Sequence, residues 1–320
     1  KLAFMDTLSI KSKIRQQAFD IGFSKCGFAV SRFLTSDFEH YKKQIALGFH
    51  ADMLYLEKEA EKRFHPLLVH PDIRTVIVLL AGYKTNARQK DGAFYSISDY
   101  ALIPDYHKIM KEGLQKLSCF IENEFHSDVL INFVDTGHIS EKAWAREAGL
   151  GNFGKNSILL TPEGSYFFIG VILTDLVIIP DEAFDEDLCK NCDLCIKSCP
   201  TQAIHQPYAV DARLCISYHT IENKGHIPSN IIEKIGTQIY GCDICQKVCP
   251  WNRHQTVNSV LFSPLPPLLD MKAEDFESVT ETDFRERFHE SPMVRLGHRR
   301  YMRNIEAVKN MAATERKRPY

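Results

Sequence analysis

The sequence predicts a protein of mixed α+β and α/β class, built from three consecutive parts. Residues 1–180 alternate between helical and strand patterns, residues 181–262 contain a dense group of cysteines, and residues 263–320 form a short helical segment with a basic end. With 320 residues, of which 44% are hydrophobic, the chain is long enough to bury more than one core. The alternation in the first part is the pattern expected of helices packed on a sheet.

Hydrophobic periodicity defines the elements of the first part. Apolar residues at helical spacing predict helices over 8–23 and 105–125, and continuous apolar runs predict buried strands within 74–83 and 128–137. The last of these strands places Asp135 near its carboxyl end. Open α/β sheets bind ligands at such ends, so Asp135 is a candidate acid–base residue. Capping of the following turn is an equally good interpretation.

The stretch Ala148–Asn156, AGLGNFGKN, matches two phosphate-binding patterns at once. It spells G-x-G-x-x-G from Gly149 to Gly154, and G-x-x-x-x-G-K from Gly149 to Lys155. Both patterns bind phosphate only where a strand turns into a helix. Here a helix capped by Ser140 precedes the glycines, and two strands around a Pro-Glu-Gly-Ser turn follow them. A turn that approaches its neighbours or another ligand is therefore favoured over NAD or nucleotide binding.

Eight of the ten cysteines fall between Cys189 and Cys249. No secretory signal is visible, so we expect a cytoplasmic protein in which clustered cysteines bind metal instead of forming disulfides. The first four spell C-x2-C-x2-C-x3-C-P, the run of bacterial two-cluster ferredoxins, and are Cys189, Cys192, Cys195 and Cys199. Two C-x2-C knuckles, which zinc would require, are absent from this spacing. The pattern predicts a ferredoxin-like domain with two clusters.

The second cysteine run lacks the first position of the same pattern, because Ile239 stands there. Cys215 is the obvious replacement, and two [4Fe–4S] clusters then use all eight cysteines. The first cluster would bind Cys189, Cys192, Cys195 and Cys249, and the second would bind Cys199, Cys215, Cys242 and Cys245. The alternative is a free Cys215 thiol beside a [3Fe–4S] cluster. Cys26 and Cys119 are interpreted as small buried hydrophobic residues.

The carboxyl-terminal segment is basic, although the whole chain has a net charge of −2. From Arg295 to Tyr320 there are eight Lys or Arg and two Glu. The sequences RLGHRRYMRN and ERKRP are typical of a surface that contacts a phosphate backbone. A solvated helix face with a basic tail is the alternative. No apolar run approaches the length of a membrane span, so no membrane association is expected.

Together these motifs resemble the epoxyqueuosine reductase family. The segments RLCISYHTIENKGHIP, which supplies Cys215, and GCDICQKVCPWN are similar to the cluster-binding part of that family. The segment VDTGHISEKAWAREAGLGNFGKNSILLTPEGSYFFIGVILTDL is similar to its long central region, and so is the DYH of Asp105–His107. The matching positions extend from Ile97 to Asn252.

The resemblance implies a cobalamin in the N-terminal α/β domain, against the ferredoxin-like module, and a reaction on tRNA. The epoxide of epoxyqueuosine in the anticodon loop is reduced to a cyclopentene, while two electrons and two protons enter and water leaves. The clusters would pass electrons singly to cobalt, and an external flavodoxin-type or ferredoxin-type donor would supply them. The expected partner is tRNA carrying epoxyqueuosine, and the chain is expected to be a monomer.

The resemblance also assigns individual residues. Asp135 matches the proton donor of the family, and because it must be protonated near neutral pH, we expect burial against the corrin to raise its pKa. Lys155 and Asn156 would hydrogen-bond the corrin amides, so AGLGNFGKN would shape the corrin pocket. The other positions that line the cobalamin in the family are Ser98, Leu159, Ile169, Ser217, Cys242 and Asp243. Contacts with tRNA are expected from Lys224, His226, Arg299, Arg300 and Arg303.

Two departures from related patterns matter. The D-x-H-x-x-G signature of His-ligated cobalamin proteins is incomplete, because Met110 replaces the glycine that should follow Asp105 and His107. A base-off cobalamin without His107 on cobalt is therefore expected. Some relatives also have a C-terminal helical-repeat extension, which this chain is expected to lack, leaving more of the tRNA contact to the basic segment.

Two other functions fit part of the same evidence. A reductive dehalogenase also combines cobalamin with iron–sulfur clusters, but acts on a small molecule and is usually exported with a twin-arginine signal. A ferredoxin-type electron-transfer protein would need neither a large α/β domain nor a poised Asp135. Cobalamin binding separates the electron carrier from the two reductases, and salt-sensitive tRNA binding separates the dehalogenase from the tRNA enzyme.

Overall fold

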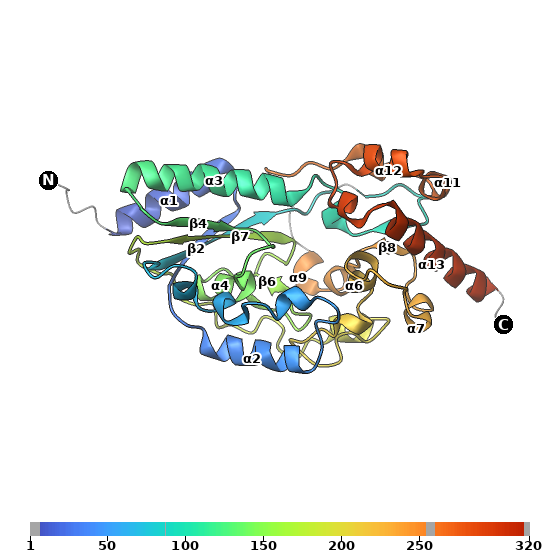
Figure 1. The fold of residues 1–320 in the computed structure, drawn as a ribbon, viewed down its shortest axis with the longest axis horizontal. Coiled ribbons are helices and arrows are strands. Elements are labelled where there is room, and N and C mark those ends of the chain that lie inside the picture. Colours follow the sequence, from blue (N-terminus) through green and yellow to red (C-terminus); the bar gives the residue numbers. More distant parts are fainter. Residues whose placement is uncertain (1–6, 87, 254–259, 317–320) are drawn as a thin grey trace.

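A four-stranded sheet forms the centre of the N-terminal half in the computed structural model, which describes residues 7–86, 88–253 and 260–316 (Figure 1). Its strands, in spatial order, are β1 (Lys25–Val30), β2 (Thr75–Gly82), β7 (Phe167–Thr174) and β4 (Leu130–Phe133). Every neighbouring pair is antiparallel. The sheet is therefore not of the open α/β type on which the interpretation of Asp135 as a ligand-site residue rested. Asp135 nevertheless follows β4 directly.

Helices cover both faces of this sheet. On one face lie α1 (Thr7–Ile21) and α3 (Tyr106–Phe125), and on the other lie α4 (Glu141–Glu147) and α2 (Thr35–Ala46) (Figure 1). The central strand β2 is buried on both sides. Ile77 and Leu79 belong to the core beneath α1 and α3, whereas Val76 and Val78 pack in the core that contains Trp144. This alternation is the strand period of two, applied to a sheet covered twice.

Most elements expected in this half are confirmed. The helices and strands predicted around Ile14, Leu79, Leu117 and Ile131 are α1, β2, α3 and β4. The two strands predicted after the glycines are β6 (Leu159–Leu160) and β7. β6 pairs with β5 (Asn152–Phe153), which lies within the glycine stretch, and β7 joins the central sheet instead. Ser140 precedes α4 but makes no side-chain capping bond, so that expectation is wrong.

Short helices connect these elements. In the N-terminal half they are η1 (Leu54–Leu56), η2 (Ala60–Arg63), η3 (Pro66–Leu68) and η4 (Asp99–Ala101). The cysteine-rich part contains α5 (Leu194–Ser198), η5 (Ala212–Leu214), α6 (Ile216–Ile221), α7 (Ser229–Ile232), β8 (Gln238–Tyr240), α8 (Ile244–Lys247) and α9 (Pro250–Arg253). The C-terminal part contains α10 (Pro266–Leu269), α11 (Ala273–Glu277), α12 (Glu281–Phe288), η6 (Pro292–Leu296) and α13 (His298–Arg316).

A further apolar core joins parts of the chain that are distant in sequence. It contains Tyr95 from the N-terminal part, Ile239 from β8, and Phe284 and Tyr301 from the C-terminal helices. The strand β3 (Ser96–Ile97) pairs in parallel with β8, and α13 packs beside β8 (Figure 1). The division at residues 180 and 262 stays a prediction. None of the helices in the described ranges is both long and apolar enough to cross a bilayer.

Candidate functional site

A large cavity lies where the sheet half meets the cysteine-rich and C-terminal parts. Its volume is about 1080 Å³. The residues that line it come from every part of the chain and include Tyr41, Tyr106, His107, Asp135, Glu141, Ser217, Lys224 and Arg295. A concave site with an apolar body and a few convergent polar groups is the usual form of a ligand site. The volume is at the upper end of the range for such sites, so a macrocycle the size of a corrin is within its capacity.

Asp135 is held in an uncommon backbone conformation at the wall of this cavity. Its φ is +57°, in the left-handed region that residues other than glycine rarely occupy. The backbone N–H of Asp135 donates to Oε1 of Glu141 at 2.5 Å, and the Tyr106 hydroxyl donates to Oδ2 of Asp135 at 2.8 Å. The side chain of Asp135 is 56% exposed. The carboxyl group is thus fixed by its neighbours and accessible from the cavity.

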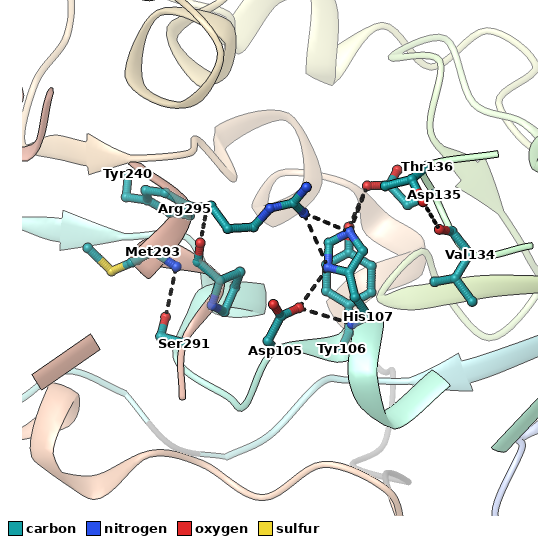
Figure 2. Close-up of polar contacts among 11 residues, drawn as sticks. Asp105, Tyr106, His107, Val134, Asp135, Thr136, Tyr240, Ser291, Met293 and Arg295 are labelled. Carbon is teal, nitrogen blue, oxygen red and sulfur yellow. Dashed lines mark hydrogen bonds and ion pairs between the residues drawn. The ribbon is translucent and has the colours of Figure 1, made fainter. Parts of the chain in front are cut away.

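His107 lies between two carboxyl groups (Figure 2). Its Nδ1 atom is 2.7 Å from Oδ1 of Asp105, and its Nε2 atom is 3.2 Å from Oδ2 of Asp135. Asp105 is also the N-cap of α3, where its carboxylate accepts the backbone N–H of His107 at 3.0 Å. The capping residue therefore orients the imidazole that contacts Asp135.

Arg295 adds a positive charge to this group from η6. Its Nη1 atom is 2.8 Å from Nε2 and 3.4 Å from Nδ1 of His107. Because Nη1 is close to both ring nitrogens, it lies over the ring face and not along the in-plane direction of Nε2. The in-plane partner of Nε2 is therefore the Asp135 carboxylate.

The charges of these groups set their pKa values. Burial acts to raise the pKa of Asp135, but hydrogen bonds from His107 and Tyr106 and the charges of His107 and Arg295 outweigh it and lower that pKa. The expected rise in the pKa of Asp135 is therefore wrong for these surroundings. Burial acts to lower the pKa of His107, whereas hydrogen bonds and charges from Asp105 and Asp135 raise it overall. Both shifts favour the ion pair, in which Asp135 is a carboxylate and the His107 imidazole carries the proton.

Glu141 behaves in the opposite way from Asp135. Burial, followed by the charge of the adjacent Asp135 carboxylate, raises the pKa of Glu141 to about 8. Burial also lowers the pKa of the neighbouring Lys142 ammonium, which donates to the backbone oxygen of Ser157 at 2.6 Å. Two adjacent carboxyl groups thus differ in protonation, which is the usual mark of an acid–base site.

The cysteines fall into two groups of neighbours. A smaller cavity is lined by Cys189, Cys192, Cys195, Cys245 and Cys249. Burial, then the charges of Cys189, Cys249 and Cys192, raises the pKa of Cys195 to about 11. Burial, then Cys215 and Cys199, raises the pKa of Cys242 to about 12. These neighbours follow the two expected ligand sets except that Cys245, expected at the second cluster, also lines the smaller cavity. The assignment of each thiolate to a cluster stays a prediction.

The chemistry of these sulfur groups fits clusters better than single ions. Within the described residues, no three cysteine, histidine or acidic side chains converge closely enough to hold one metal ion. In a cubane each thiolate binds a different iron atom, so the sulfur atoms surround a space instead of meeting at a point. Ile239, at the missing position of the second run, is fully buried in the apolar core, and Cys215 lies beside Cys199 and Cys242.

The stretch AGLGNFGKN lies between the two cavities. Asn152 and Phe153 line the large cavity, whereas Gly154, Lys155 and Asn156 line the cysteine cavity. The Lys155 ammonium donates to the backbone oxygens of Lys190 at 2.7 Å and Cys192 at 2.9 Å. The structure thus places the Lys155 side chain against the cysteine loop, where the resemblance had suggested corrin amides.

Close backbone approach explains the glycines of this stretch. A side chain at Gly149, where φ is +73°, would come within 2.5 Å of the backbone oxygen of Glu182, and one at Gly151 within 2.5 Å of that of Leu160. Gly149 follows the C-cap of α4, as its position in the sequence predicted. The preceding helix and following strands exclude the strand-to-helix geometry that nucleotide binding would need.

The structure separates the positions expected to line a cobalamin. Asp135 and Ser217 border the large cavity. Asp243 is buried and accepts hydrogen bonds from the Ser98 hydroxyl and, at 2.7 Å, from the backbone N–H of Asp99. Three further positions contribute mainly to packing or to the cysteine groups, namely Leu159, Ile169 and Cys242. Any role of these residues at a corrin stays a prediction.

The expected tRNA-contacting residues also divide into two kinds. Lys224, His226 and Arg299 are exposed, and Lys224 lies at the edge of the large cavity. Arg300 instead donates to the backbone oxygen of Ile221 at 2.8 Å. Arg303 donates to the backbone oxygens of three residues, His219, Asn223 and Gly225.

The two half-buried arginines therefore fasten the loop that presents Lys224 and His226. The basic residues Lys317 and Arg318 of the ERKRP segment lie outside the described residues.

Several site residues were missed by the sequence analysis. Tyr106, Glu141 and Arg295 lie within quoted segments but were assigned no role, and only the fold brings them to Asp135 or His107. Figure 2 shows Tyr106 and Arg295 beside His107 and Asp135. The D-x-H spacing of Asp105 and His107 was the one usable signal. Of the two isolated cysteines, Cys26 is buried as expected, whereas Cys119 is exposed on α3, so its interpretation as a buried residue is wrong.

The sequence matches known protein families and individual relatives. The family model "Epoxyqueuosine reductase QueG, DUF1730" matches residues 63–136, and the model "4Fe-4S double cluster binding domain" matches residues 188–252. An epoxyqueuosine reductase from Cellulophaga algicola is 39% identical over 298 residues, covering 92% of this chain and 97% of the relative. One from Synechocystis is 38% identical over 268 residues, covering 82% and 92% of the two chains.

Solved structures agree as well. A crystal structure of epoxyqueuosine reductase with an epoxyqueuosine-modified tRNA-Tyr stem loop has a TM-score of 0.87 and 28% identity, covering 96% of this chain and 82% of that one. The Bacillus subtilis enzyme, with its catalytic aspartate loop swung out of the active site, has a TM-score of 0.86 and 26% identity, with the same coverage. A reductive dehalogenase, at 13% identity and a TM-score of 0.52, shares the fold. With close relatives along nearly its whole length, this chain belongs to the epoxyqueuosine reductase family of oxidoreductases.

Proposed function

We propose that this chain reduces epoxyqueuosine to queuosine in the anticodon loop of tRNA, with Asp135 as the proton donor at a cobalamin. The observation that carries the proposal is the position of Asp135 on the wall of the large cavity, fixed by Tyr106, His107 and Glu141. The chain combines this poised carboxyl group with a two-cluster module, as an electron-driven reaction on a ligand in the cavity requires.

The large cavity and its lining residues fit a corrin. The cavity has the volume for a macrocycle, and both aromatic and polar side chains line it. His107 is held by Asp105 and Asp135 on its two ring nitrogens, which supports a cobalamin without a histidine ligand. When bound, cobalamin would supply the reducing metal centre at the epoxide, and the two [4Fe–4S] clusters would supply its electrons one at a time.

The proton transfers follow from the charges in the site. Asp135 has a lowered pKa and His107 a raised one, so the resting pair consists of a carboxylate and an imidazolium. As negative charge develops on the epoxide oxygen, the proton moves from Nε2 of His107 to Oδ2 of Asp135 and on to that oxygen. Asp105 stabilises the imidazolium before the transfer and fixes the ring orientation throughout.

The partners follow from the same arrangement. Lys224 at the cavity edge and the exposed Arg299 and His226 would contact the tRNA backbone around the reacting nucleoside. An external donor of the flavodoxin or ferredoxin type would deliver electrons to the clusters, whose eight cysteines are all half-buried. We propose that the chain acts as a monomer in the cytoplasm.

An anaerobic titration of the cluster-reconstituted protein with cob(II)alamin, followed by EPR, tests the proposal. We expect a base-off signal that saturates at equimolar cobalamin, and reduction of an epoxyqueuosine-containing stem loop by the loaded protein. Absence of cobalamin binding with both clusters intact would contradict it. Cobalamin binding without salt-sensitive tRNA binding would favour a small-molecule reductase, which the fold shared with the dehalogenase would accommodate.

A further inference from the structure

The reaction requires more protons than one donor holds. Both carbon–oxygen bonds of the epoxide break and a carbon–carbon double bond forms, while two electrons enter. The oxygen leaves as water and takes two protons with it. Asp135 passes one proton at a time, so a second proton must be stored beside it or fetched from solvent within the turnover.

Glu141 is placed to store that proton. It is the first residue of α4, and its Oε1 atom accepts the backbone N–H of Asp135 at 2.5 Å. Both carboxyl groups line the large cavity, so a single water molecule within it can bridge them. The two residues are also close in sequence, and the turn between β4 and α4 brings Glu141 back to Asp135.

We propose that Glu141 is a positioning residue that holds the second proton of each turnover and returns it to Asp135 after the first transfer. This inference rests on the proposed function. In the resting site one proton would lie on His107 and one on Glu141, so the site holds the two protons that the reaction consumes. Solvent then reprotonates both groups after the product leaves.

The surroundings of Glu141 support this role. The titratable groups that face it are Tyr106 and His107 from α3, Asp135 from the preceding loop, and Lys142 on its own helix. Burial and the Asp135 charge raise the pKa of Glu141 to about 8, although Lys142 and His107 oppose this effect. The His107 charge helps to lower the pKa of Asp135, so once the imidazole has given up its proton, the Asp135 carboxylate is the better acceptor for the proton of Glu141.

Glu141→Gln isolates the stored proton from the structural contact. The glutamine amide oxygen still accepts the Asp135 N–H, so the loop geometry is kept while the acid is lost. We expect the turnover number to fall at least tenfold with KM nearly unchanged, and Glu141→Asp to restore part of it. We also expect the wild-type rate to fall near pH 8 as Glu141 loses its proton, and Glu141→Gln to lack this step and to keep only the decline that deprotonation of His107 causes.

Glu141→Leu separates the two roles of the side chain, because it removes both the proton and the acceptor. If the turnover number falls in Glu141→Leu but not in Glu141→Gln, then Glu141 only holds the Asp135 loop and the proton role is overturned. A pH–rate profile of Glu141→Gln that matches the wild type would overturn it as well. If the wild-type enzyme does not reduce the stem loop at all, the proposed function itself is refuted. This outcome is distinct from failure of the proton role of Glu141.

The pH dependence of thermal unfolding provides a readout without activity. A carboxyl group with a raised pKa binds its proton more tightly in the folded state, so wild-type stability falls as the pH rises from the unfolded pKa of Glu141 to about 8. We expect Glu141→Gln to lack this decline, so the difference between the two Tm values should change with pH. A difference that stays constant between pH 5 and pH 9 would contradict a proton on Glu141.

Discussion

The Nε2 atom of His107 lies 3.2 Å from the Oδ2 atom of Asp135 (Figure 2). This contact joins the first turn of α3 to the loop after β4, two elements that the chain separates by the whole length of α3. It places a raised-pKa imidazole against a lowered-pKa carboxylate. The proton needed near neutral pH is therefore available one hydrogen bond away from the residue that delivers it.

Asp135→Asn should abolish epoxide reduction without disturbing the cofactors. The amide has nearly the same shape but cannot pass on a proton, and the loss of a general acid typically costs about 10²–10⁴-fold in rate. EPR of the loaded protein and nucleoside analysis of the reacted stem loop measure the two effects. Asp128→Asn, the same change at an exposed position before β4, serves as the control. Normal turnover in Asp135→Asn would remove it as the acid.

Asp105→Asn should shift the alkaline limit of activity. The Asp105 carboxylate helps to raise the pKa of His107, so its loss should lower that pKa and deprotonate the imidazole at a lower pH. We expect the rate of this variant to decline earlier as the pH rises, while His107→Gln should be slow at every pH. The measurement is a pH–rate profile under saturating tRNA. An Asp105→Asn profile that matches the wild type would show that His107 supplies no proton.

Cys215→Ala should remove one cluster. The protein with two cubanes contains about eight iron atoms per chain, and loss of one cubane leaves about four. Cys119→Ala offers a matched control, because Cys119 is an exposed thiol on α3, far in sequence from the other eight cysteines. Iron analysis and EPR of both reconstituted variants check this expectation. Full iron content in Cys215→Ala would refute the assignment of Cys215 to the second cluster.

Lys155→Met should labilise the cluster held by the first cysteine run. The Lys155 ammonium donates hydrogen bonds to the backbone oxygens of both Lys190 and Cys192. Without these bonds, the loop that carries the thiolates should be less rigid. We expect faster iron loss to a chelator, with Lys155→Arg close to the wild type because it keeps the charge and the donors. Equal rates in Lys155→Met and the wild type would show that the contact does not stabilise the cluster.

Arg299→Ala should weaken tRNA binding, whereas Arg303→Ala should lower the stability of the fold. Arg299 is exposed, so its loss should weaken tRNA binding and reduce the salt slope by about one. Arg303 donates to backbone oxygens of the 219–225 loop, so Arg303→Ala should lower the free energy of unfolding by about 2 kcal/mol. Thermal unfolding and binding at several salt concentrations separate the two variants. A stable Arg303→Ala protein with a reduced salt slope would show direct contact with tRNA.

Local patterns in the sequence were sufficient for several features. The periodicity around Leu79 and Leu117 predicted β2 and α3, because strand and helix faces are set by residue spacing alone. The cysteine spacing predicted the double-cluster region, since ligand geometry at one cluster depends on residues a few positions apart. The glycine stretch was rightly separated from nucleotide binding by the order of its neighbouring elements.

The tertiary structure decided the remaining features. The resemblance implied a raised pKa for Asp135, but Tyr106, His107 and Arg295 reach it from α3 and η6 and lower that pKa. Similarly, the sequence predicted a tRNA contact for Arg303, and only the fold shows that its guanidinium also donates to distant backbone oxygens. The sequence by itself determined which residue types and short spacings were available. Their charges and roles were decided by contacts between distant segments, because electrostatic effects depend on distance in space and on burial, and neither is encoded by spacing along the chain.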